Sequence, residues 1–142
     1  VEIIATGNGD LVYSIDDLSD FQYSNIFYNV PYGIHQVYVK DSNGCGLVGP
    51  IEIYVLGIPK FFTPDGDGVN DTWNLVGSSA NFNKNAEILI FDRHGKFIHQ
   101  QFGDGEGWDG TLNGRPLPSD DYWYVITLED QRVYKGHFTL FR

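Results

Sequence analysis

Apolar residues in this chain recur at every second position, and this pattern limits the fold more than any other feature of the sequence. No long window places apolar residues at positions i, i+3, i+4 and i+7, as an amphipathic helix would. The alternating runs are separated by Gly, Asn, Asp and Pro, which favour turns. The sequence therefore predicts an all-β protein with short strands, as in sandwiches and small barrels.

The predicted strands fall into two groups on either side of a seam at residues 57–59. Asp92 to Gly95 and the pair Asn113-Gly114 predict tight hairpin turns, since Asn and Gly tolerate a positive φ. We therefore predict two tandem immunoglobulin-like β-sandwich modules, residues 1–56 and 57–142. The expected strands are residues 11–15, 34–40, 51–56, 73–76, 87–91, 96–100, 122–128 and 133–141.

Composition excludes several classes of protein. Nineteen acidic residues against nine basic ones give a formal charge of −10, which opposes phosphate binding and argues against a nucleic-acid partner. Aromatic residues make up 15% of the chain, too many for a disordered acidic tail. Apolar runs such as residues 88–91 are far shorter than the ~20 residues of a membrane-spanning helix. The absence of an initiator Met and of a leader suggests a processed or cloned piece.

Nothing in the residue spacing predicts catalysis. The single cysteine, Cys45, permits no internal disulfide, and we expect it to be a small buried side chain. The histidines show no metal-ligand spacing such as His-x-His, and no nucleophile motif is present. Asp120 and Asp121 follow Pro118-Ser119 and are expected to lie in an exposed turn. The sequence thus predicts a protein that is not an enzyme.

Six blocks of residues in the second module follow a distinctive order. They are residues 61–73 (FFTPDGDGVNDTW), 90–96 (IFDRHGK), 107–110 (GWDG), 116–118 (PLP), 121–124 (DYWY) and 135–140 (KGHFTL). In this order the blocks closely resemble the gliding-motility-associated C-terminal domain, the type B sorting domain of the type IX secretion system in Bacteroidetes. Through residues 33–39 and 41–45, the first module, residues 1–56, resembles more weakly a repeat module of large surface adhesins.

The resemblance implies a cargo signal. Such domains are recognised in the periplasm, and the type IX translocon then moves the attached protein through the outer membrane to the cell surface. Type B domains are associated with partner proteins of the outer-membrane β-barrel class. The resemblance thus implies the C-terminal, non-catalytic region of a gliding-motility adhesin, which in full length could bind surface glycans.

An acidic glycine loop is a candidate calcium site. Asp65, Asp67 and Asp71, with the Val69 carbonyl, are spaced as in the calcium loops of extracellular repeat proteins. Because Ca²⁺ takes six to eight oxygens, further ligands would have to come from a second acidic loop that carries Asp104, Glu106 and Asp109. The alternative is that these side chains only satisfy backbone groups of the turn.

Two further surfaces are candidate binding sites. The basic residues Arg93, His94, Lys96 and Arg115 stand out in an acidic chain, and we expect their turns, with the strand at residues 135–142, to face the secretion partner. The alternative is that these charges only aid solubility. A carbohydrate-binding module is the alternative function, with three tryptophans as a sugar-stacking platform; core packing is the more common role of such residues. The three are Trp73, Trp108 and Trp123.

Overall fold

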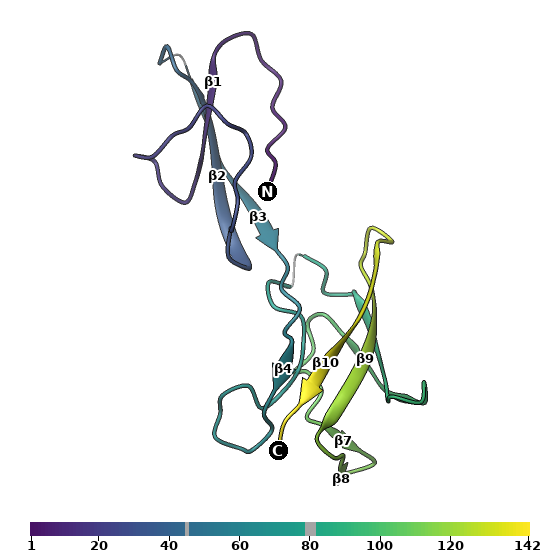
Figure 1. The fold of residues 1–142 in the computed structure, drawn as a ribbon. Coiled ribbons are helices and arrows are strands. Elements are labelled where there is room, and N and C mark those ends of the chain that lie inside the picture. The colour runs from purple at the N-terminus through teal and green to yellow at the C-terminus, as the bar shows by residue number, and fades with distance from the viewer. Residues whose placement is uncertain (45, 79–81) are drawn as a thin grey trace. The chain divides into compact units, whose positions relative to one another are not determined.

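The computed structural model describes residues 1–44, 46–78 and 82–142, and it divides into two compact units. We call Val1–Val55 unit 1 and Leu56–Arg142 unit 2. Among these described residues there are strands, bridges and turns but no helix, and hence none long and apolar enough to cross a membrane (Figure 1). The all-β prediction is confirmed, in keeping with an immunoglobulin-like β-sandwich, whereas the count of two such modules stays a prediction. Cys45, expected to be buried, lies outside the described residues.

Unit 1 is built on a three-stranded antiparallel sheet in the order β1-β2-β3. The strands are β1 (Leu11–Ile15), β2 (Gly33–Asp41) and β3 (Leu47–Val55). Strand β1 has the predicted bounds, but β3 begins at Leu47 instead of residue 51. Gly49 and Pro50 interrupt the apolar alternation there, so the sequence pattern conceals the first half of the strand. The register between β2 and β3 shifts between Val37 and Val39.

Unit 2 contains a five-stranded sheet in the order β4-β10-β9-β5-β6 and a separate two-stranded sheet, β7-β8. Strands β4 and β10 pair in parallel and all other pairs are antiparallel. The short β7-β8 hairpin turns at Asn113-Gly114, as predicted, with a positive φ at both residues. The bounds are β4 (Phe61–Phe62), β5 (Glu87–Phe91), β6 (Phe97–Phe102), β7 (Thr111–Leu112), β8 (Arg115–Pro116), β9 (Asp120–Thr127) and β10 (Val133–Leu140).

The core of unit 2 lies against one face of the five-stranded sheet. Alternate residues of β9 and β10 point into it, because successive side chains of a strand point to opposite faces. The ring of Phe138 stacks on Trp73 with centroids 3.9 Å apart, and Trp108 meets Phe138 edge-on. The buried apolar residues of this core are Phe62, Trp73, Leu75, Ala86, Ile88, Ile90, Ile98, Trp108, Tyr122, Ile126, Leu128, Phe138 and Leu140.

The strand predicted at residues 73–76 is wrong. Only isolated bridges form there: Trp73 pairs with Trp108, and Val76 pairs with Gly57. The amide of Trp73 donates to the carbonyl of Trp108 at 2.9 Å, and the reverse bond measures 3.0 Å. The segment therefore covers the sheet as a loop that is fastened at two points.

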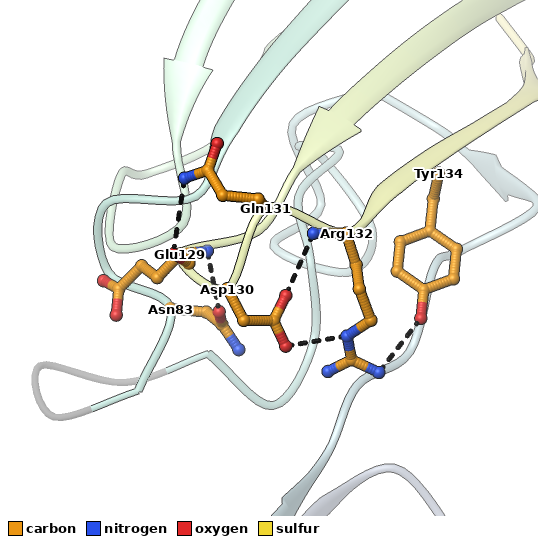
Figure 2. Close-up of polar contacts among 6 residues, drawn as sticks. All are labelled: Asn83, Glu129, Asp130, Gln131, Arg132 and Tyr134. Atoms are coloured by element: carbon orange, nitrogen blue, oxygen red, sulfur yellow. Dashed lines mark hydrogen bonds and ion pairs between the residues drawn. The ribbon is translucent and has the colours of Figure 1, made fainter.

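The turn between β9 and β10 is tied to the segment that precedes β5 (Figure 2). The Glu129 amide donates to Asn83 Oδ1 at 3.4 Å, and the Asn85 amide donates to the Glu129 carboxylate at 3.0 Å. Within the turn, Arg132 Nε pairs with Asp130 Oδ2 at 2.7 Å. Arg132 Nη1 also reaches the Tyr134 hydroxyl at 3.4 Å.

Candidate functional site

The acidic loop after β4 brings three carboxylates together. One oxygen from each of Asp65, Asp67 and Asp71 lies within 4.8 Å of the others. Asp65 and Asp67 are exposed, and Asp71 is half-buried. Among the residues that the structure describes, this is the one group of three or more such side chains close enough to share a metal ion.

Backbone amides of the same loop already use part of this oxygen set. Asp71 accepts from the Gly66 amide at one oxygen, at 2.7 Å, and from the Gly68 amide at the other, at 2.8 Å. Asp65 Oδ1 accepts from the amide of Asp67 at 3.0 Å. Asp67 Oδ1 accepts in turn from the amide of Val69 at 2.7 Å. These bonds fold the loop without an ion and leave the second oxygens of Asp65 and Asp67 available as hard ligands.

The second acidic loop does not complete this group. Asp104, Glu106 and Asp109 were the expected additional ligands, and none of them joins the three carboxylates. Asp109 Oδ1 instead accepts from the Thr111 hydroxyl at 2.7 Å and from the Thr111 amide at 3.0 Å. These bonds, the hydroxyl one first, lower the pKa of Asp109 and assign it a role in the turn. Three carboxylates and the Val69 carbonyl are fewer groups than the six to eight oxygens of Ca²⁺.

The predicted basic cluster is partly assembled. Arg93, His94 and Lys96 lie in the β5–β6 turn and line a cavity of about 240 Å³ together with Asp120 and Tyr122. Arg115 opens β8 and is not among the residues that line this cavity. The structure therefore brings three of the four predicted partner-binding residues to one place.

The turn that carries these cations is held by an acid. Asp92 Oδ1 accepts from the amides of His94 at 2.8 Å and Lys96 at 2.9 Å. The bond from the Lys96 amide is the main cause of the lowered pKa of Asp92. The side chain of Arg93 pairs loosely with Asp120, at 3.5 Å.

The prediction that Asp120 and Asp121 lie in an exposed turn is wrong. They are half-buried and open strand β9. Asp121 Oδ1 accepts from the Thr139 hydroxyl of the neighbouring strand at 2.6 Å. This cross-strand bond fixes Asp121 in the sheet, and Asp120 is the register partner of Leu140, which turn composition did not reveal.

Burial decides between the two roles weighed for the tryptophans. Trp73 is 0% exposed and Trp108 1% exposed, so both are core residues that no sugar can reach. The indole of Trp108 donates to the Thr111 carbonyl at 2.9 Å, and Gly110 has a positive φ, so residues 108–110 form a structural corner. Trp123 is 40% exposed and stands apart from the other two. The three tryptophans therefore form no common platform.

A polar cavity of about 360 Å³ beside Trp108 is lined by both a histidine and an acid, two residue types that can take part in catalysis. His99 and Asp109 both line it, and burial is the main cause of the lowered pKa of His99. Thr111 also lines the cavity, and its hydroxyl donates to Asp109. The relay from hydroxyl to imidazole to carboxylate that nucleophilic catalysis needs is thus not formed by these three residues.

Arg142 links distant segments of unit 2 by hydrogen bonds, a role that sequence analysis did not predict. Its guanidinium donates to three carbonyls: Leu117 at 2.8 Å, Gly110 at 3.0 Å and Pro64 at 3.3 Å. Its amide donates to the Ser119 hydroxyl at 2.8 Å. These partners lie 23 to 78 residues away along the chain, and no local pattern predicts such contacts. The arginine thereby holds the acidic loop and two other turns against the end of β10.

A second missed feature is a row of rings on the outward face of the five-stranded sheet. Phe97, Phe91, Trp123 and His137 are successive register partners across β6, β5, β9 and β10. The rings of Phe91 and Phe97 are 6.0 Å apart, and those of Trp123 and His137 are 5.9 Å apart. The period-two pattern assigns the residues of each strand to two faces of the sheet. It does not show that aromatic residues of neighbouring strands meet on the outward face.

Comparison with known proteins identifies unit 2. The model of a protein family, the CHU_C Type IX secretion signal domain, matches residues 56–140, more than half of the chain. No curated protein and no solved structure matches the chain. The resemblance inferred from the ordered blocks is thus confirmed. Such a domain directs secretion across the outer membrane to the cell surface and implies contact with the secretion machinery. The chain belongs to the family of type IX secretion signal domains.

Proposed function

We propose that this chain is the non-catalytic C-terminal region of a secreted surface adhesin. In this proposal unit 2 is the folded signal that the type IX apparatus recognises in the periplasm, and unit 1 is an adhesin repeat-like module. The observation that carries the proposal is that the family match, residues 56–140, falls on one compact unit with its own core, Leu56–Arg142. An export signal recognised after folding needs such a self-contained unit.

The proposed partner is an outer-membrane β-barrel protein of the type IX system. The association of type B domains with such barrels supports this choice, and a Bacteroidetes gliding adhesin is the cargo that the resemblance favours. The exposed side chains of Arg93, His94 and Lys96 around one cavity supply a basic contact point in an otherwise acidic chain. Arg115 is kept as a second, separate point of contact.

A fusion experiment tests the export role. The full chain is joined to the C-terminal end of a periplasmic reporter and expressed in a Bacteroidetes host with the type IX apparatus. The reporter is expected at the surface, where an external protease removes it. In a host without the apparatus, and with a fusion that stops at residue 55, it is expected to stay in the periplasm. Equal surface exposure in all three strains would contradict the proposal.

A shorter fusion assigns the signal to one unit. Residues 56–142 alone are expected to support the same surface display as the full chain. If the short fusion stays in the periplasm while the full chain is displayed, unit 1 is also part of the signal. Charge reversal at Arg93 and at Arg115 then tests the basic contact points one at a time.

A further inference from the structure

The outward face of the five-stranded sheet carries a contiguous apolar patch. Trp123 is 40% exposed and Phe97 is 52% exposed, and half-buried Phe91 lies between them in register. Leu89 and Val125, also register partners, form the next row on the same face. We call these five residues, Leu89, Phe91, Phe97, Trp123 and Val125, the outward patch.

The outward patch is not needed to close the core. The residues of β9 that seal the core, Tyr122 and Ile126, point to the opposite face and are almost fully buried. An antiparallel sheet with one face on its core commonly presents a polar second face to water. A contiguous apolar second face is instead typical of a site of protein contact.

A free cation stands at the rim of the outward patch. Lys135 is the register partner of Val125 and is exposed. In the part of the chain that the structure describes, its ammonium has no carboxylate within 4.0 Å. Two acids of the same face, Glu87 and Asp121, accept from the neutral side chains of Gln100, at 3.1 Å, and Thr139. The charge of Lys135 is therefore unpaired and available to a carboxylate of a partner.

We propose that the outward patch is the surface by which unit 2 docks onto the secretion machinery, against a protein that presents an apolar patch with a carboxylate opposite Lys135. The proposal rests on the export role of unit 2 and names the contact surface for it. The family match selects the partner, because a type IX secretion signal domain contacts the secretion machinery. A second copy of this chain would instead bring a further charge of −10. The aromatic centre and polar rim match the usual anatomy of a protein interface.

Matched substitutions test the surface in the full chain fused to the periplasmic reporter. The double variant Trp123→Thr with Phe97→Thr removes the rings but keeps a residue that favours strands. Tyr134→Thr is the control, since Tyr134 is 41% exposed and pairs with the core residue Ile126, on the opposite face of the same hairpin. We expect the double variant to lower surface display at least about tenfold, as loss of interface aromatics does. The control is expected to match the wild type.

Two single variants keep the test decisive if the double variant does not fold. Phe97→Thr changes an exposed residue of the edge strand β6, and Lys135→Glu changes only the rim charge. Each is expected to lower display several-fold while the unfolding temperature of the purified chain stays at the wild-type value. Display equal to that of the control in both single variants would overturn the proposal.

The outcomes separate this proposal from the export role itself. If the wild-type fusion is not displayed, the export role fails. If the wild type and the double variant are displayed equally, only the docking surface fails. A purified chain that sediments as a dimer, and as a monomer after Trp123→Thr, would assign the patch to self-association. Saturable binding of a polysaccharide that quenches Trp fluorescence and is lost in Trp123→Thr would assign it to glycans. Either result would overturn the docking proposal.

Discussion

At the scale of single residues, the nearly buried imidazole of His35 in unit 1 contacts a hydrogen-bond acceptor at each of its two nitrogens. Its side chain is 10% exposed, and both ring nitrogens face acceptors: Nδ1 lies 2.6 Å from Asp16 Oδ2, and Nε2 lies 2.7 Å from the Pro31 carbonyl. An imidazole that donates at both nitrogens is protonated. The bond to Asp16 raises the pKa of His35 above its ordinary value of 6.5, against the opposing effect of burial. The same bond, with the Gln36 amide, lowers the pKa of Asp16 below 3.8.

These shifts predict that unit 1 is most stable in mildly acidic solution. The contribution of His35 is complete below its unfolded pKa of about 6.5 and disappears as pH rises through the raised folded value. The contribution of Asp16 is present above its unfolded pKa and disappears as pH falls through its lowered folded value. The unfolding temperature of unit 1 is thus expected to peak between about pH 4 and 6.5. The loss above that range should be at most about 1 kcal/mol, since water screens the half-exposed Asp16.

Thermal unfolding of the full chain across pH measures this profile. His35→Gln should flatten its alkaline side, because glutamine cannot gain a charge. His94→Gln, an exposed change in unit 2, should leave the profile of unit 1 unaltered. An unchanged profile in His35→Gln would assign the pH dependence to other groups.

At the scale of elements, two glycines in left-handed turns allow a matched comparison. Gly110 has φ +79 and Gly114 has φ +75. A Cβ at Gly110 would lie 2.8 Å from Leu140 Cδ1 and 2.9 Å from Arg142 Nη2, whereas at Gly114 it would meet nothing within 4 Å. Gly114→Ala is expected to cost about 1–2 kcal/mol for the backbone alone. Gly110→Ala should cost about 1–3 kcal/mol more, because the corner must shift.

Urea unfolding of unit 2 in both variants measures the difference. The comparison is controlled internally, since both substitutions add the same atom to nearly the same backbone conformation. Equal destabilisation would show that the Trp108-Asp109-Gly110 corner yields without cost and does not hold β10 in place.

The acidic loop after β4 is the second element with a testable role, and we propose that it binds Ca²⁺. Asp67→Asn separates the two explanations of the loop, since asparagine can still accept the amide of Val69 but carries no charge. Calcium at about 100 times its dissociation constant should stabilise the wild type by about 2.7 kcal/mol. Asp67→Asn should lose most of that gain, and Asp104→Asn, outside the group, should keep it.

Unfolding temperatures with calcium and with a chelator provide the measurement. If calcium does not raise the unfolding temperature of the wild type, the carboxylates serve only the turn. An equal rise in the wild type and in Asp67→Asn would place the ion elsewhere.

Strands were predictable where alternation runs without interruption. β1 and β5 have the predicted bounds, and β9 and β10 differ only at their ends, because apolar residues at every second position leave one register with a buried face. Residues 73–76 show the limit of the method: Trp73 and Leu75 alternate as in a strand, but their partners form only isolated bridges. A periodic pattern predicts which side chains are buried more reliably than it predicts a ladder.

The candidate sites were predictable only where their residues are close in sequence. The acidic loop and the β5–β6 turn each lie within a few residues, so composition was sufficient to find them. The contacts of Arg142 and the pairing of Arg93 with Asp120 join distant segments and depend on the order of the strands. The outward patch depends in addition on which face of the sheet the loops cover. The alternation of side chains does not predict this, because it has the same period on both faces.

At the scale of the whole molecule, the two units differ in the amount of core that each possesses. Among the residues that the structure describes, thirteen buried apolar side chains form the core cluster of unit 2, whereas those of unit 1 are Val12, Val37, Tyr38 and Val39. Because small domains with little buried apolar surface are marginally stable, unit 1 is expected to unfold at a lower temperature than unit 2. Calorimetry of the full chain should therefore show two transitions, and residues 56–142 alone should retain the upper one.

One substitution in each unit assigns the transitions. Phe138→Ala removes a fully buried ring that stacks on Trp73, and it should lower only the upper transition, at a cost of about 3–5 kcal/mol. His35→Gln should move only the lower one. A single transition that responds to both changes would mean that the two units unfold as one. The signal would then depend on unit 1 for its stability, and a short fusion of residues 56–142 would be degraded in the periplasm before export.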